Sequence, residues 1–130
     1  MVETALYADD LGAAERFYRE LLGLTLVGRD EGRHVFFQTG ENQVLLLFRP
    51  DSTLKGDRLP PHGARGPGHV AFGIAAEDLD SWRDRLLRHG VEVEHEETWQ
   101  RGGRSLYFRD PSGNLVELLT PGVWGLPSGW

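Results

Sequence analysis

The sequence predicts an α+β fold made of two tandem βαβββ modules. Three observations predict it: two amphipathic helices of similar design, a short apolar strand before each helix, and three β-rich runs after each helix. A βαβββ unit curves its sheet and leaves one face open. We therefore expect the two modules to form a curved mixed sheet around a cleft that holds a small ligand.

The first module centres on a helix. Apolar residues recur at helical spacing from Leu11 to Leu22. Asp9 or Asp10 stands where a helix cap is needed, and Gly23 stands where a left-handed residue ends a helix. We expect the strands of this module over residues 4–7, 25–29, 35–38 and 44–48.

The second module repeats this design. Its helix has Leu79, Trp82, Leu86 and Leu87 on the apolar face and closes at Gly90 after His89, with Asp78 or Asp80 as the expected cap. The strands of this module are expected over residues 70–74, 91–95, 105–108 and 115–119.

The last hairpins of the two modules, FQTGENQVLLLF and FRDPSGNLVELL, align with a constant offset of 71 residues, which places Phe37 on Phe108 and Phe48 on Leu119. The stretch between them, residues 50–68, is rich in Pro and Gly and predicts a loop that acts as a linker or a mobile lid. We expect one domain over residues 1–130. Its parts are module one at 1–49, the loop at 50–68, module two at 69–121 and a C-terminal tail at 122–130.

Composition excludes several functions. Cysteine is absent, so any metal must bind nitrogen and oxygen ligands, and disulfides and cysteine nucleophiles are excluded. The formal charge of −6 opposes binding to the phosphates of nucleic acid. The N-terminus has no basic and apolar leader, and no apolar run approaches the roughly 18 residues of a membrane span. We therefore expect a cytoplasmic protein that binds neither nucleic acid nor membrane.

Three segments resemble the recurring signatures of the vicinal oxygen chelate superfamily, which comprises glyoxalases, bleomycin-resistance proteins and extradiol dioxygenases. They are DDLGAAERFYRELLGLTLV, GHVAFGI and FRDPSGNLVELL, in the expected order. The last segment is the most specific, because a DPxGN turn feeding a strand with a glutamate is characteristic of this superfamily. The resemblance implies a glyoxalase-like fold and leaves the reaction open, since this fold hosts several chemistries.

The resemblance also implies a divalent metal ion, held by residues on the first and last strand of each module. His69 and Glu117 match two of these positions directly. Glu3 occupies a third, where histidine is commoner, and Leu46 occupies the fourth, so one ligand is lost. The implied metal ligands are therefore Glu3, His69 and Glu117. The implied ion is zinc, nickel, manganese, cobalt or iron.

This ligand set implies a metal-dependent lyase or isomerase that acts on a small oxygenated substrate. In such relatives the metal polarises a carbonyl while a carboxylate takes the neighbouring proton, which makes Glu117 or Glu3 the candidate catalytic base. Arg104 and Tyr107, on the strand before the DPSGN turn, are the candidate substrate-binding residues. Structural roles stay open for four of these positions: a solvated glutamate at 3, a core histidine at 69, a packed tyrosine at 107 and a paired carboxylate at 117.

Other functions also stay open. A metal-free protein that binds an antibiotic or metabolite is favoured by Leu46. An extradiol dioxygenase usually needs two histidines and one carboxylate, which Glu3 opposes. A fosfomycin-type thiol transferase typically has threonine where this chain has Ala5. In many relatives the first-strand ligand comes from another chain, so the resemblance implies a homodimer in addition to a small-molecule ligand.

Overall fold

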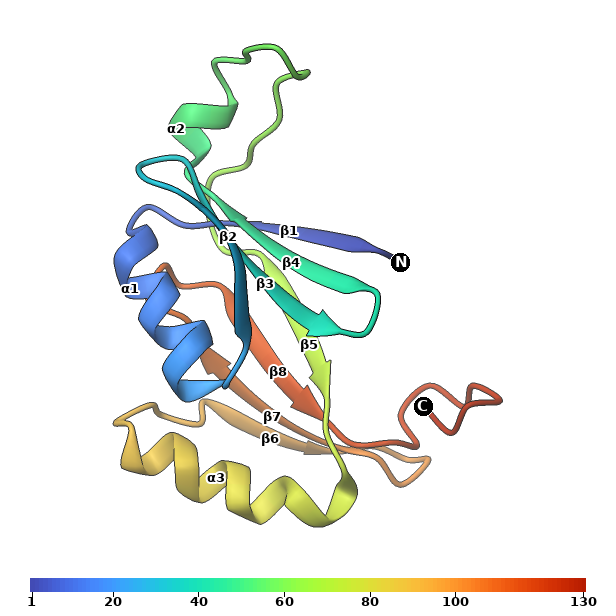
Figure 1. The fold of residues 1–130 in the computed structure, drawn as a ribbon. Helices are drawn as coiled ribbons and strands as arrows, with labels where there is room; N and C mark the ends of the chain where they lie inside the picture. The colour runs from blue at the N-terminus through green and yellow to red at the C-terminus, as the bar shows by residue number, and fades with distance from the viewer. The chain divides into compact units, whose positions relative to one another are not determined.

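The structure, a computed structural model, describes residues 1–130 and divides them into two compact units. The first unit comprises residues 1–68 and 110–114, and the second comprises residues 69–109 and 115–130. Each unit contains one four-stranded mixed sheet and one principal helix (Figure 1). The predicted α+β fold with two βαβββ modules is therefore confirmed.

The first unit follows the predicted order of elements. They are β1 (Glu3–Tyr7), α1 (Leu11–Arg16), a π-helical segment (Phe17–Leu21), β2 (Thr25–Asp30), β3 (His34–Gly40), β4 (Gln43–Phe48) and α2 (Pro50–Thr53). The sheet has the order β1-β4-β3-β2, in which β1 and β4 run parallel and the other pairs run antiparallel.

The helix of the first unit begins and ends where the sequence predicts. The backbone N–H of Ala13 donates to Oδ1 of Asp10 at 2.9 Å, which caps α1, and Gly23 has a left-handed φ of 73°. The change from α-helix to π-helix at Phe17 was not predicted, because apolar spacing does not distinguish the two. The helix buries Ala14 and Tyr18.

Side chains of the first sheet alternate between two faces, as the period of a strand requires. One face is almost fully buried and forms the core of this unit with α1; it carries Leu6, Val35, Phe37, Leu45 and Leu47. Burial of these side chains is the main stabilising contribution in the unit.

A buried polar network holds the DPSGN turn in the first unit. Oδ1 of Asp110 accepts the backbone N–H groups of Ser112 and Asn114, each at 2.9 Å. The Asn114 amide donates to Asp110 and to the carbonyl of Tyr7, and its oxygen accepts the N–H of Gly68. The motif is thus a turn whose polar side chains satisfy buried backbone groups.

The second unit has the elements β5 (His69–Gly73), a 3-10 turn (Ala76–Asp78), α3 (Leu79–Arg88), β6 (His95–Thr98), β7 (Arg104–Arg109) and β8 (Leu115–Leu119). Its sheet has the order β5-β8-β7-β6, with β5 and β8 parallel. Leu79 and Leu86 of α3 and Leu106 and Phe108 of β7 are among its core residues.

Three local predictions need correction. The strand expected over 91–95 lies at 95–98, because the N–H of Val91 donates to the carbonyl of Leu86 and closes the helix. The loop expected over 50–68 begins with α2, where a proline at the first turn favours a helix. Asp78, one of the two expected residues, holds the N-cap position of α3, but its side chain makes no capping bond, and Asp80 pairs with Arg83.

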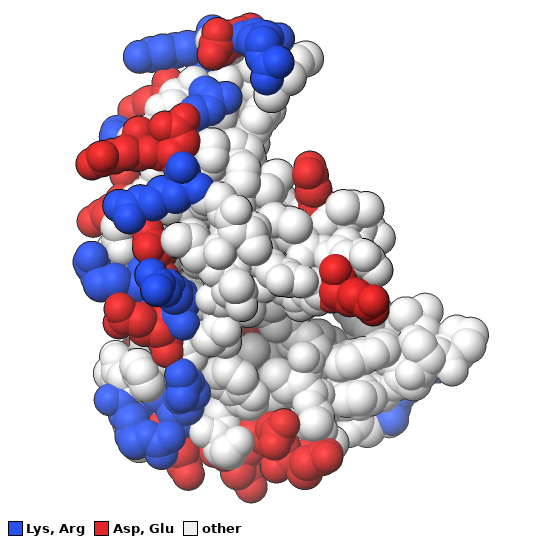
Figure 2. All heavy atoms as spheres, viewed as in Figure 1, with Lys and Arg blue, Asp and Glu red and all other residues white.

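The surface shows charges of both signs. In Figure 2, basic and acidic side chains are interspersed along the left edge of the drawn face, and most of the remaining face is uncharged. None of the helices is long and apolar enough to cross a bilayer.

Candidate functional site

Strand register gathers polar side chains on one face of the second sheet. Glu117 lies between Ala71 of β5 and Tyr107 of β7, and Tyr107 in turn lies opposite His95 of β6. Residues directly opposite each other point to the same face. This face lies opposite the one that carries the core residues, and it holds two of the predicted metal ligands and Tyr107.

His69 and Glu117 form a close pair. His69 Nε2 lies 3.3 Å from Glu117 Oε2, and His69 Nδ1 lies 3.2 Å from the carbonyl oxygen of Leu115. A carbonyl oxygen only accepts, so Nδ1 carries a proton. In the neutral ring, Nε2 then presents a lone pair to a carboxylate. A lone pair that faces a carboxylate is repelled unless a proton or a cation lies between them. A histidine that binds a metal through one nitrogen usually donates the N–H of its other nitrogen to a carbonyl or carboxylate, as Nδ1 does here.

Glu117 is a buried carboxylate with an unsatisfied oxygen. Its exposed fraction is 5%, and Oε1 has no hydrogen-bond partner. A buried carboxylate oxygen without a partner is costly, so this environment favours a positively charged group next to Glu117. The donor set of one imidazole nitrogen and one carboxylate therefore fits a divalent metal ion.

Tyr107 completes this part of the face. Burial raises the pKa of Tyr107 to about 12, and its interaction with Glu117 adds to the effect. The hydroxyl is therefore neutral at physiological pH and available as a hydrogen-bond donor. The centroid of its ring lies 6.5 Å from that of His69 and 6.1 Å from that of His95.

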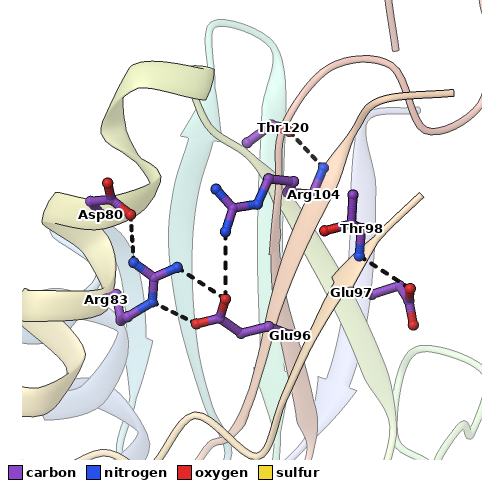
Figure 3. A network of polar contacts seen from close by, with 7 residues as sticks. All are labelled: Asp80, Arg83, Glu96, Glu97, Thr98, Arg104 and Thr120. Carbon is purple, nitrogen blue, oxygen red and sulfur yellow. Dashed lines mark hydrogen bonds and ion pairs between the residues drawn. The ribbon is translucent and has the colours of Figure 1, made fainter. Parts of the chain in front are cut away.

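Arg104 lies on the opposite face of the sheet from Tyr107. Its Nη2 is 3.7 Å from Oε2 of Glu96, which also receives two bonds from Arg83 of α3 (Figure 3). Hydrogen bonding to Arg83 lowers the pKa of Glu96. The structure therefore places the two predicted substrate-binding residues apart and ties Arg104 to α3 and β6.

Glu3 belongs to the first unit, where it holds the position that corresponds to His69. Glu3 pairs with Val44, and His69 pairs with Leu115, which lies 71 residues after Val44. Nowhere in the chain do three carboxylate or imidazole side chains gather into a metal-binding group. His69 and Glu117 therefore lie close together. Glu3 corresponds to His69 only in its position on the strand.

At the other positions where the second sheet has polar site residues, the first sheet has apolar side chains. Leu46 corresponds to Glu117, as predicted, and Phe36, which pairs with Leu46, corresponds to Tyr107. Phe36 stacks on His34 with ring centroids 4.0 Å apart. Burial lowers the pKa of His34, whose Nδ1 has no partner. This face of the first unit is aromatic where the second is acidic.

One candidate residue, His95, was missed by the sequence analysis. It lines a pocket of about 360 Å³ with Glu97, Trp99 and Tyr107. The missing signal is strand alternation: once β6 is placed at 95–98, His95 and Glu97 fall on the face of Tyr107. The expected strand over 91–95 hid this pattern.

Comparisons with known proteins agree with this fold. The family model for the Glyoxalase/Bleomycin resistance protein/Dioxygenase superfamily matches residues 1–118. A crystal structure of lactoylglutathione lyase from Agrobacterium tumefaciens is 44% identical, with a TM-score of 0.92 over 97% of this chain and 96% of that chain.

Two curated relatives are a fosfomycin resistance protein and a metallothiol transferase by name. Fosfomycin resistance protein FosX from Listeria innocua is 41% identical over 114 residues, which cover 87% of this chain and 83% of FosX. Metallothiol transferase FosB from Shouchella clausii is 32% identical over 87 residues, which cover 65% of this chain and 56% of FosB. With a family match over most of its length, the chain belongs to the glyoxalase/bleomycin resistance protein/dioxygenase superfamily.

Proposed function

We propose that the protein is a divalent-metal-dependent lyase or isomerase that acts on a small oxygenated substrate. The observation that carries this proposal is the His69–Glu117 pair, in which Nδ1 donates to a backbone carbonyl while Nε2 faces a buried carboxylate. Members of the superfamily typically bind divalent metals, and the similarity to a lactoylglutathione lyase supports a lyase.

His69 and Glu117 would hold the ion, and we propose Glu3 as the third ligand because its register matches that of His69. A bound divalent ion supplies a Lewis acid that polarises a substrate carbonyl. The other steps fall to the side chains. Tyr107, neutral because its pKa is about 12, donates a hydrogen bond to a substrate oxygen and orients it.

Glu117 or Glu3 serves as the base in this proposal. The carboxylate takes the proton from the hydroxyl-bearing carbon next to the carbonyl, and the C–H electron pair moves toward the carbonyl oxygen. The proton then returns to the former carbonyl carbon, while the hydroxyl proton passes to the former carbonyl oxygen and the hydroxyl becomes the new carbonyl. The substrate is isomerised with no net change in oxidation state. Arg104 acts by positioning Glu96, since it lies on the other face.

A metal-free binding protein is the second candidate function. It is favoured by the apolar positions of the first sheet, where Leu46 and Phe36 stand in place of a carboxylate and a tyrosine. Phe36 and His34, whose rings stack on each other, would bind a planar ligand by stacking against it. In this case binding occurs without metal uptake.

Metal content tests the proposal. The purified protein is stripped with a chelator, reloaded in turn with zinc, nickel, manganese, cobalt and iron(II), and measured by elemental analysis. We expect near-stoichiometric metal, and we expect it to be lost in His69→Ala and Glu117→Gln. His89→Ala and Glu92→Gln serve as controls, because both residues are exposed and lie outside the site.

Turnover is then screened with thiol adducts of 2-oxoaldehydes and with fosfomycin, which the names of the relatives suggest. Metal uptake that both site variants abolish supports the enzyme. No uptake of any of the five ions would overturn the metal-dependent proposal and leave the binding protein.

A further inference from the structure

The sheet face of the second unit extends beyond His69 and Glu117 to its edge strand, β6. There a pocket of about 360 Å³ opens over β6 and β7. Two aromatic rings, those of Trp99 and Tyr107, line it together with the carboxylate of Glu97. We propose that this pocket binds an ammonium group, and that the substrate of the proposed enzyme carries one.

Glu97 supplies a negative charge that no arginine or lysine compensates. Its Oε1 accepts the backbone N–H of Thr98 at 3.1 Å, and its Oε2 lies 3.2 Å from Nε2 of His95. No arginine or lysine lies within ion-pair distance of this carboxylate. A carboxylate has about four acceptor sites, so Glu97 can still accept from an N–H donor or pair with a cation.

The neighbouring carboxylates are already neutralised. Glu96 is turned to the other side of β6, where Arg83 and Arg104 meet it (Figure 3). Glu94 also lines the pocket, but Arg109 holds both of its oxygens at 2.8 and 3.0 Å and lowers its pKa. The charge that remains in the pocket is therefore that of Glu97.

The aromatic walls are held in place. The indole N–H of Trp99 donates to Oγ of the buried Ser105 at 2.8 Å, which fixes the ring beside Glu97. Tyr107 is half-buried between Glu117 and His95. Aromatic faces next to a carboxylate attract organic cations, because the ring quadrupole and the negative charge act together.

The pocket adjoins the candidate site through Tyr107. Glu117, Tyr107 and His95 form one row across three neighbouring strands, so His95, at the far side of the pocket, lies about 10 Å from Glu117. The substrate would therefore carry its ammonium group within about this distance of its reacting carbonyl. This role for a substrate rests on the proposed function, whereas the cation pocket itself can be tested without the reaction.

The test uses tetramethylammonium chloride as the cation and tert-butanol as a neutral probe of the same shape. Both are titrated into the full chain in the presence of a chelator at constant ionic strength. The readout is the indole N–H signals in a nitrogen–proton correlation spectrum. Four tryptophans give four signals, and Trp99→Phe assigns the one that matters.

We expect a saturable shift of the Trp99 signal with tetramethylammonium and none with tert-butanol, while Trp82 on α3 stays unmoved. Glu97→Gln is expected to weaken binding about tenfold. Glu92→Gln, which removes the same charge outside the pocket, leaves it within about twofold.

Three results would overturn the proposal: no Trp99 shift, equal affinities for the two glutamine variants, or a larger shift with sodium methylphosphonate than with the cation. Because a chelator is present, the outcome is independent of metal uptake. If the pocket binds the cation but the protein takes up no metal, the cation pocket stands and the proposed enzyme does not. If the protein takes up metal but the pocket does not bind the cation, the proposed enzyme stands and the cation pocket does not.

Discussion

The Tyr18 hydroxyl donates a 2.9 Å hydrogen bond to Oδ2 of Asp110, which lies 92 residues later in the chain. Both residues are buried, with exposed fractions of 0% and 4%. Burial and the nearby Asp110 carboxylate raise the pKa of Tyr18 well above its usual value, so its hydroxyl stays protonated and keeps donating. This bond anchors the DPSGN turn to the helix of the first unit.

Tyr18→Phe is expected to lower the free energy of unfolding by about 1.5 to 3 kcal/mol, because a buried charged acceptor loses a donor. Tyr7→Phe is the matched control, since its hydroxyl meets the exposed His62, and it should cost about 0.5 kcal/mol or less. Urea unfolding followed by circular dichroism measures both. Equal costs for the two variants would contradict the importance of the buried bond.

The same turn explains why the second hairpin was predictable from sequence. The strand over 115–119 was predicted at its observed bounds, because Asp110 and Asn114 determine the turn through local hydrogen bonds. The offset of 71 residues is also a real register, because Phe36 pairs with Leu46 as Tyr107 pairs with Glu117. The local hydrogen bonds of the turn and the repeated sequence pattern therefore made most of the fold predictable.

Other features depend on distant partners. The edge strand β6 reads HEET and has no apolar alternation, so nothing local distinguished it from the preceding turn. The face of Arg104 follows from the buried Leu106 and Phe108 on the same strand, which the sequence analysis did not use. The unsatisfied oxygen of Glu117 is a property of packing alone.

The pair of Arg83 and Glu96 should make stability depend on acid pH. Hydrogen bonding to Arg83 holds the pKa of Glu96 below its ordinary value of 4.5, so the folded protein binds this proton less readily than the unfolded chain does. The stabilisation is complete above pH 4.5 and is lost as the pH falls through the lower folded value.

Arg83→Met is therefore expected to return the pKa of Glu96 toward 4.5, as measured by carbon NMR of the carboxyl group. Its loss of stability relative to the parent should shrink as the pH is lowered from 4.5. Arg88→Met, at the exposed end of α3, should leave the pKa of Glu96 unchanged. A stability difference that grows in acid would contradict the assigned pair.

The Trp130 ring packs on the backbone of Gly73, on the same face of β5 as His69. A methyl group added at Gly73 would stand 2.2 Å from the nearest carbon of the ring, closer than contact allows. Gly73→Ala should therefore displace Trp130 and destabilise the second unit by about 1 to 3 kcal/mol.

A double-mutant cycle isolates this effect. In a Trp130→Ala background, Gly73→Ala should cost much less, because the clash is gone. Gly12→Ala is the control, since its nearest contact would be 3.4 Å and the residue lies in α1, where alanine is favoured. Equal costs of Gly73→Ala in both backgrounds would show that the ring does not press on this glycine.

Mixing two defective variants tests the proposed role of Glu3. If Glu3 of one copy completes the metal site of another, then Glu3→Gln and Glu117→Gln each abolish tight metal binding as homodimers. A mixed dimer, formed by unfolding and refolding the two together, would contain one site with both wild-type residues and one with both substitutions. About half of the mixed dimers' sites should then bind metal.

If Glu3 acts within its own chain, every site of the mixture carries one substitution, and metal binding stays absent. If Glu3→Gln alone binds metal as the parent does, Glu3 is not a ligand, and His69 and Glu117 are the proposed ligands that remain.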